Sequence, residues 1–456
     1  MKINLANVYT SLFFVGLFFF PFNCFTGIKA LGEFKNESGA YFFLAGFLIL
    51  CFSKKIRIPV SSPVFRIIMI FLCWCVISTI LNAGAVNSSF FKHTTGLNRF
   101  VRQFFALCIS ALIFFLFYYN VMVKMSLRDI LTKIRKIFLY SLMLACVFSF
   151  FEALVGFYGI GIARKAFDIF NYFPFFEKRN IQDRISAFAD EPPFFAVYLI
   201  TVSGWMFSYI ITNKGVTKYL PTLAILILTF YSGSRTALIV ILIQVLIFFI
   251  TIIPKKKFVR YGINTVLIVS FFTIGLFVFK GDKIIKAFEE KIESLDFKSN
   301  LTKTVSNQSR FGMQYAALQV FLEHPLIGVG YGQQTYYSRF EYPGWATKHN
   351  YEFSLWYRNP NLPAFPPSYN MYTRLLAETG LVGISIFLIL LFFCIKKIKY
   401  LIRTLHGDGR TLAVILLVVL SGLFINLLQI DTFRLYGLWL SFAILIILSS
   451  KQIAHE

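Results

Sequence analysis

Four arginines lie beside or just inside long apolar segments, where an unpaired charge is costly. They are Arg184, Arg235, Arg310 and Arg374. An arginine in such a position usually has a partner, and its guanidinium group binds phosphate through two parallel hydrogen bonds. The four positions therefore predict an anion site near a membrane surface. The alternative is that these side chains reach out to the interface or form structural pairs with Glu191 or Glu378.

Three groups that could move a proton lie near these arginines in the sequence. They are Glu191, His324 and Tyr369, and the reference pKa of tyrosine is ~10. The loops around them hold no acidic pair with metal-binding spacing, so we expect the chemistry to need neither a metal nor another cofactor.

A dense aromatic stretch follows three alternating glycines. The glycines are Gly328, Gly330 and Gly332, and they predict a tight turn or a close approach of the backbone to a ligand. Disordered segments are poor in aromatic residues, so we expect the stretch from 331 to 372 to fold. Exposed rings suit the apolar C–H faces of sugars, and Tyr331, Trp345 and Trp356 are the candidate sugar-binding residues. The alternative is that the rings form a small aromatic core.

The composition is that of a membrane protein. Hydrophobic residues make up 57% of the 456 residues, charged residues only 14%, and phenylalanine occurs 57 times. A soluble protein could not cover so much apolar surface. The apolar runs are continuous rather than alternating, which favours helices over a membrane barrel. The fold class that follows is an all-α, polytopic membrane protein.

The apolar runs predict about twelve spans of bilayer-crossing length. They cover 6–25, 39–53, 64–82, 100–122, 137–160, 193–212, 219–232, 235–253, 263–280, 372–395, 411–430 and 435–450. This divides the chain into nine spans within 1–280, a large loop at 281–371, and three spans with a C-terminal tail in 372–456. Within the loop, the apolar spacing predicts an amphipathic helix over 283–295 and a second helix over 309–324.

The net charge of +24 lies largely in alternate short loops. These basic loops are at 54–57, 124–136, 214–218, 255–260 and 396–410, and all fall on one side of a twelve-span arrangement. The pattern is the positive-inside signature of membrane proteins, so we do not expect a nucleic-acid partner. It predicts that both termini are cytoplasmic and that the large loop faces outward.

Four segments in order resemble the bacterial family of O-antigen ligases and polymerases. They are 184–193 with Glu191, the Ser-Gly-Ser-Arg stretch at 232–238, Arg310 with 324–330, and 370–380 at the return into the membrane. The resemblance covers roughly residues 180–395. Ligases of the family carry a His-Asn pair where this chain has Tyr369 and Asn370, so the resemblance tilts toward the polymerases.

The resemblance implies transfer of a glycan from undecaprenyl diphosphate to a sugar hydroxyl of a lipid-linked repeat unit. Arg235 and Arg310 would stabilise the leaving diphosphate, with Arg184 as the third choice and with Asn370 and Arg374 as further substrate-binding residues. A general base would take the proton of the hydroxyl; Glu191 and His324 are the candidates, Tyr369 is a weaker one, and the sequence leaves the choice open. The resemblance also implies a bacterial inner membrane with the large loop in the periplasm. The implied partners are lipid-linked oligosaccharides, membrane lipids and a chain-length regulator. The alternatives are a ligase that joins glycan to lipid A core, and a flippase or transporter of lipid-linked oligosaccharides.

Overall fold

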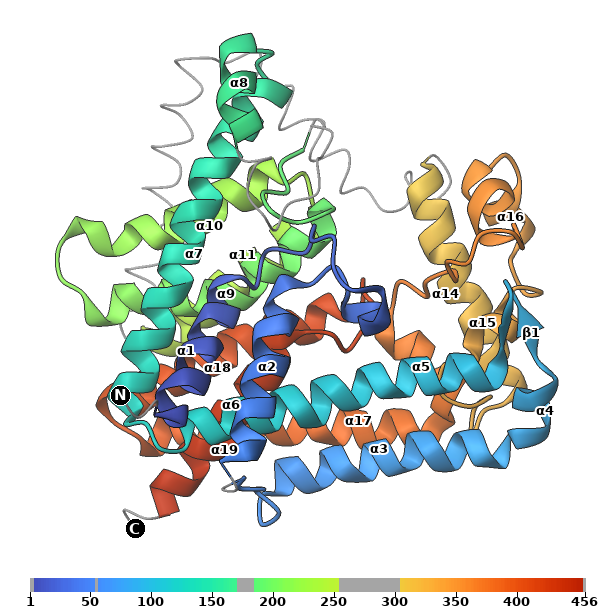
Figure 1. Cartoon of the computed structure of the whole chain (residues 1–456), viewed down its shortest axis with the longest axis horizontal. Coiled ribbons are helices and arrows are strands. Elements are labelled where there is room, and N and C mark those ends of the chain that lie inside the picture. The colour runs from blue at the N-terminus through green and yellow to red at the C-terminus, as the bar shows by residue number, and fades with distance from the viewer. Residues whose placement is uncertain (1–3, 54–55, 170–183, 254–303, 454–456) are drawn as a thin grey trace.

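The computed structural model describes residues 4–53, 56–169, 184–253 and 304–453, and helices dominate this part of the chain (Figure 1). The α-helices are α1 Leu5–Phe18, α2 Ser38–Phe52, α3 Pro63–Leu81, α4 Ala83–Ser88, α5 Gly96–Cys108, α6 Phe115–Met122, α7 Leu127–Gly156, α8 Gly161–Ile169, α9 Pro192–Thr212, α10 Leu220–Tyr231, α11 Arg235–Ile252, α14 Val305–Glu323, α15 Gln334–Ser338, α16 Gly344–Thr347, α17 Met371–Thr404, α18 Gly407–Asn426 and α19 Tyr436–Ile453. Short 3-10 helices cover Lys29–Phe34 (η1) and Val216–Tyr219 (η4), and π-helices cover Ile109–Phe114 (η2) and Phe353–Tyr357 (η5). Strands β1 Phe90–Phe91 and β2 Thr94–Thr95 form an antiparallel pair.

The helices agree with an all-α membrane protein. Among the described residues, seven are long and apolar enough to cross a membrane, and four shorter apolar helices accompany them. Each of these eleven overlaps one predicted span. The predicted span at 263–280, the basic loop at 255–260 and the predicted helix at 283–295 lie outside the described residues, so the count of twelve stays a prediction.

One predicted boundary is wrong by about three helical turns. The sequence pattern placed residues 124–136 in a basic loop, but α7 begins at Leu127 and includes the basic residues from Arg128 to Lys136. Ser126 caps this helix by accepting a hydrogen bond from the Asp129 amide at 3.0 Å. The cap starts the helix well before its apolar part, and hydropathy alone does not detect that.

Helices α9 and α18 form the centre of the membrane domain. In each, 78% of the apolar window is buried, against 28% in α11. A side chain at Gly204 of α9 would place its Cβ 2.9 Å from the Ile415 carbonyl oxygen, so glycine allows the two helices to approach closely. The buried Gln244 of α11 donates to the carbonyls of Ile200 and Val418, both at 3.0 Å, and so joins three helices.

Helix α17 is broken at Gly380, which has a φ of +62°. The segment before α15 fills the break with backbone hydrogen bonds: the Val329 amide donates to Ala377 and the Gly330 amide to Glu378, both at 2.9 Å. On the far side of the break, the Leu381 amide donates to Pro325 at 2.8 Å. A broken helix in a membrane needs such replacement partners because no water is present to supply them.

Polar side chains of α3 complete this junction. Ser78 donates to the Ile327 carbonyl at 2.8 Å, Trp74 to Thr379 at 2.9 Å and Asn82 to Gly328 at 3.0 Å. Gly328 therefore lies against the backbone of α17, and the predicted approach of the glycines to a ligand stays a prediction. A side chain at Gly328 would place its Cβ 2.5 Å from the Glu378 carbonyl carbon.

The described part of the large loop packs beside α17 and the β1–β2 hairpin, with α14, α15 and α16 grouped together (Figure 1). Tyr342, Phe353 and Tyr357 are buried against Met313 and Ala316 of α14. The predicted small aromatic core is therefore present.

Both chain ends lie near the turn between α6 and α7. Lys124 donates to the Tyr9 hydroxyl at 3.2 Å, and Lys451 donates to the Met125 carbonyl. The two ends of the described chain thus lie on one side, as Figure 1 also shows. Which side of the membrane this is remains the prediction of the charge pattern.

Candidate functional site

Three of the predicted catalytic residues line one cavity, which we name the Arg310 cavity. Its volume is about 420 Å³. Glu191, Arg310 and Tyr369 come to it from three separate segments. The remaining lining comes from the end of α1, the start of α9, the tip between α10 and α11, and the segment 426–436, and includes Phe20, Pro21, Phe194, Ser234, Gln429, Asp431, Arg434 and Leu435.

Arg310 is held in this cavity by uncharged groups. Its guanidinium carbon lies 5.2 Å from the centre of the Tyr369 ring, and its Nη1 donates to Gln429 Oε1 at 3.4 Å. Its Nε has no hydrogen-bond partner within the described part of the chain. A ring face stabilises a guanidinium by about 0.5–2 kcal/mol, less than a paired carboxylate does in a site shielded from water. The Arg310 guanidinium therefore keeps donors for an anion.

Tyr369 has backbone strain and is a poor base. Its φ of +54° is unusual for a residue other than glycine. The hydroxyl forms a 3.0 Å hydrogen bond with the Tyr357 hydroxyl. Burial raises the pKa of Tyr369, although Tyr357 and Arg310 act against that rise. The phenol stays protonated near neutral pH, so Tyr369 fits a supporting role under Arg310.

Arg235 and Arg184 approach the same place from two other segments. Arg235 is the first residue of α11, whose Ser234 cap accepts from the Ala237 amide at 3.3 Å. It interacts electrostatically with Arg310 and Arg184, and donates to Asn307 at 3.4 Å. The chain of Arg184 packs on Gly233, where an added Cβ would lie 3.0 Å from Arg184 Cδ. Three arginines distant in sequence therefore cluster, at a helix N-terminus that itself favours anions.

A buried carboxylate holds the Arg184 segment in place. Glu152 of α7 accepts hydrogen bonds from the amides of Ser186 at 3.1 Å and Ala187 at 2.9 Å. The Ile185 amide donates to the Tyr231 carbonyl at the end of α10. These hydrogen bonds are made by backbone amides of the segment, so the position of Arg184 beside the α10–α11 tip does not depend on the contacts of its own side chain.

Glu191 has the electrostatics of a general base. It precedes α9, keeps contact with solvent and lines the cavity. The surrounding protein raises its pKa, Asp190 raises it further, and Arg310 acts against both. A carboxylate with a raised pKa is a stronger base than an ordinary glutamate, so Glu191 is the best placed of the three candidate bases.

Part of the chain is similar to a known family. Residues 220–388 match a family model described as O-Antigen ligase. The similarity covers less than half of the chain. The matched segment includes Arg235, Arg310 and Tyr369, while Arg184 and Glu191 lie before it. No curated protein matches the sequence.

This similarity supports a role as a polymerase or ligase in O-antigen assembly. The described residues include no group of three or more His, Cys, Asp or Glu side chains able to hold a metal ion. Metal independence stays a prediction for this chain.

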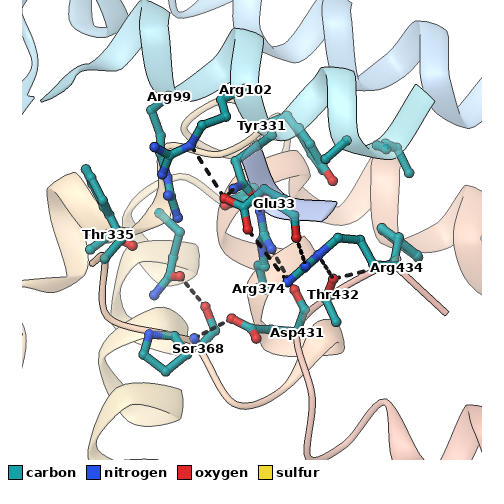
Figure 2. A pocket seen from close by; sticks show the side chains of 18 of the residues that line it. Glu33, Arg99, Arg102, Tyr331, Thr335, Ser368, Arg374, Asp431, Thr432 and Arg434 are labelled. Atoms are coloured by element: carbon teal, nitrogen blue, oxygen red, sulfur yellow. Dashed lines mark hydrogen bonds and ion pairs between the residues drawn. The ribbon is translucent and has the colours of Figure 1, made fainter. Parts of the chain in front are cut away.

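Two further predicted residues line a second cavity, which we name the Arg99 cavity (Figure 2). Its volume is about 320 Å³, and both Tyr331 and Arg374 line it. Arg374 pairs with Glu378 at 3.1 Å and donates to the Asp431 carbonyl at 2.6 Å and to Gln103 at 3.1 Å. Arg374 is therefore bound by protein groups, in agreement with the alternative that it forms a structural pair with Glu378.

The structure does not bring the remaining predicted residues into either cavity. Asn370 caps α17, accepting from the Tyr372 amide at 2.9 Å. His324 ends α14, about 20 Å along the helix axis from Arg310, and its ring lies 5.5 Å from that of Tyr337. Trp345 and Trp356 are 42% and 48% exposed on the outer loop. They remain available to a glycan outside the cavities.

Residues that the sequence analysis missed join the two cavities. Arg434 lines both, pairs with Glu37 at 2.7 Å and lies 3.6 Å from Glu33. Burial raises the pKa of Glu37, and Arg434 acts against it. Burial would also raise the pKa of Glu33, but Arg434 and the other arginines around Glu33 lower it overall. The sequence signal that could have found these residues was the close spacing of Glu33 and Glu37, just before the short apolar run at 39–53.

Proposed function

We propose that this protein is an O-antigen polymerase. It would transfer a glycan from undecaprenyl diphosphate to a lipid-linked repeat unit at the periplasmic face of the bacterial inner membrane. The observation that supports this most is the convergence of Arg184 and Arg235 on Arg310, which lines one cavity together with Glu191, a carboxylate of raised pKa. These groups were selected from separate segments of the sequence, and their clustering is what a diphosphate site requires.

The proposed chemistry is a single displacement at the anomeric carbon of the donor. The acceptor hydroxyl oxygen forms the new bond to that carbon, and the bond from the carbon to the diphosphate oxygen breaks. Glu191 receives the hydroxyl proton, and undecaprenyl diphosphate leaves with the negative charge. Arg235 and Arg310 stabilise that charge as it grows, a type of effect often worth about 3–4 kcal/mol per donor.

The walls of the Arg310 cavity suit an amphipathic substrate. Arg310 and Glu191 give it a polar side, while Phe20, Phe194 and Leu435 give it an apolar one. A polyprenyl diphosphate has the same division, with charge next to hydrocarbon. The guanidinium of Arg310 forms no ion pair with a carboxylate among the described residues, which leaves it for the diphosphate.

The residues at the start of α17 favour a polymerase over a ligase. Tyr369 and Asn370 occupy the place where ligases of the family carry a histidine and an asparagine. Tyr369 is stacked under Arg310 and Asn370 caps the helix, so neither is arranged as a base. The alternatives remain a ligase acting on lipid A core and a flippase.

Deletion of the gene separates the three functions when surface lipopolysaccharide is run on a gel. Loss of a polymerase should leave core with a single repeat unit. Bare core with accumulated lipid-linked polymer would identify a ligase instead. Bare core without outward-facing polymer would identify a flippase. Either of the last two patterns contradicts the proposal.

A further inference from the structure

Arg99 is the arginine of the Arg99 cavity that has no ion pair among the described residues. The described lining of the cavity holds Arg99, Arg102, Arg374 and Arg434 together with Glu33, Glu378 and Asp431. Arg374 and Arg102 each approach a carboxylate within 3.5 Å, and Arg434 pairs with Glu37 at 2.7 Å. The Arg99 guanidinium therefore keeps its donors for a bound anion.

Arg99 extends from α5 toward the middle of the cavity (Figure 2). Its guanidinium carbon lies 4.0 Å from the centre of the Phe365 ring. Its Nε is shielded from solvent and has no hydrogen-bond partner among the described residues. A buried donor without a partner is costly, and a planar guanidinium is suited to a bidentate carboxylate.

The groups around Arg99 are held firmly. Lys92, which is 2% exposed, donates to the carbonyls of Trp356 at 2.7 Å and Ala364 at 2.8 Å. The Ser368 amide donates to Asp431 Oδ2 at 2.6 Å. Hydrogen bonds therefore hold the segment both before and after Phe365. The ring on which the Arg99 guanidinium lies is fixed in place without a ligand.

The remaining lining suits a sugar better than a lipid. The hydroxyl of Thr335 and the amides of Gln103 and Gln334 lie beside the apolar surfaces of Phe365, Pro366 and Pro367. The volume is at the lower end of the roughly 300–1,000 Å³ typical of small-molecule sites, which fits a short saccharide. The Arg99 cavity shares Pro367, Asp431, Thr432 and Arg434 with the Arg310 cavity, so a sugar bound here would lie next to the transfer site.

We propose that the Arg99 cavity binds an acidic sugar residue of the glycan substrate, with Arg99 pairing its carboxylate. The inference rests on the proposed function, because it takes the glycan to be the substrate of the neighbouring site. It narrows the substrate class to repeat units that contain a uronic acid or a similar carboxylated sugar.

The test uses the full-length protein in lipid nanodiscs and two free trisaccharides. One contains glucuronic acid, and the other is its carboxyl-reduced form with glucose in that place. The wild-type protein should bind the acidic trisaccharide about tenfold more tightly, as expected for one charge-assisted contact. Arg99→Gln should remove that preference, and Arg99→Lys should keep part of it.

Arg339→Gln is the matched control. Arg339 also lies over aromatic rings, at 4.7 Å from Phe91 and 4.5 Å from Phe340, and its Nε also lacks a partner among the described residues, but it is outside the cavity lining. The preference should survive this change. Equal binding of the two trisaccharides by the wild type, or an unchanged preference in Arg99→Gln, would overturn the inference.

Inorganic pyrophosphate separates this inference from the proposed function. Pyrophosphate binding should be lost in Arg310→Ala and kept in Arg99→Gln. A wild type that prefers the acidic trisaccharide but does not bind pyrophosphate contradicts the diphosphate site and leaves the acidic-sugar site intact. Pyrophosphate that displaces the acidic trisaccharide, with weaker binding in Arg99→Gln, would show that the Arg99 cavity takes phosphate and would overturn the inference.

Discussion

Arg310 and Arg374, which line the two neighbouring cavities, are held by different kinds of partner. In the Arg310 cavity, Arg310 is held by a ring face and an amide oxygen at 3.4 Å. In the Arg99 cavity, Arg374 is held by a carboxylate at 3.1 Å and a carbonyl at 2.6 Å. An arginine with full protein partners gains little from a ligand, whereas one with weak partners gains a great deal. The difference indicates that counter-charge, rather than the number of arginines, marks where an anion binds.

The largest expected effect is on the arginines of the proposed diphosphate site. Arg310→Ala and Arg235→Ala should each lower glycan transfer by about 10³-fold, since they remove charge stabilisation at the leaving group. Arg235→Lys should also lose most activity if two-pronged binding is needed. The measurement is ladder formation on lipid-linked repeat units with protein levels matched by immunoblot.

Arg339→Ala is the control for both variants, because Arg339 lies outside both cavities. A wild-type ladder in Arg235→Ala would refute the phosphate assignment. Full activity of Arg235→Lys would reduce the role of Arg235 to that of a point charge.

The next effect concerns the base. Glu191→Gln should lower transfer by about 10²-fold, because the amide cannot accept the hydroxyl proton. A base works only when deprotonated, so activity should fall as the pH drops through the raised pKa of Glu191. The acid limb of the pH–rate profile should therefore have its midpoint above ~4.3, the ordinary value for glutamate.

Asp190→Asn sharpens this prediction. Asp190 helps to raise the pKa of Glu191, so its neutralisation should move the acid limb to lower pH while transfer at neutral pH continues. An acid limb that does not move, or that persists in Glu191→Gln, would assign the titration to another group.

Arg434 lines both cavities, and its loss should have a smaller effect on glycan transfer but a clear effect on the stability of the protein. Arg434→Ala leaves Glu33 and Glu37 without their common partner, and should lower the free energy of unfolding by about 3 kcal/mol. Thermal unfolding in detergent, followed by tryptophan fluorescence, measures the change. Adding Glu37→Gln should recover part of the loss; a double variant that is as unstable as the sum of both single variants would show that the pair is not coupled.

The smallest effect is expected at His324. His324→Ala should change transfer by less than about twofold, since the residue lies about 20 Å along α14 from Arg310. Initial rates at saturating substrate provide the measurement. A hundredfold loss with unchanged protein levels would return His324 to the list of catalytic bases.

The sequence predicted the parts of the site that depend on residue type. An arginine at the edge of an apolar run is costly, so Arg235 could be selected without a structure, and Arg184 and Arg310 were selected from segments of the predicted outward loops. Arg374 was selected as well, because the sequence offers Glu378 as a partner but does not show that its carboxylate faces the guanidinium. Whether each of the four arginines binds substrate or forms a structural pair depends on the groups around it, and only the fold shows those groups.

Other features depended on contacts between distant segments. Arg99 and Arg434 are separated by most of the chain, and Glu33 joins them through a short 3-10 helix that hydropathy does not detect. The break in α17 was also missed, because residues 372–395 read as one continuous apolar run. Gly380 was visible, but its conformation depends on the backbone of residues 325–330.

The junction at Gly380 has a consequence for how the chain is made. The backbone groups exposed by the break in α17 are matched by residues that precede the helix by some fifty positions. During synthesis, α17 therefore cannot reach its final hydrogen-bonded state in the bilayer until the 325–330 segment has folded against it. Insertion of the last part of the protein and folding of this segment are one step, because a chain with the segment excised would leave the Ala377 and Glu378 carbonyls and the Leu381 amide of α17 without these partners in lipid.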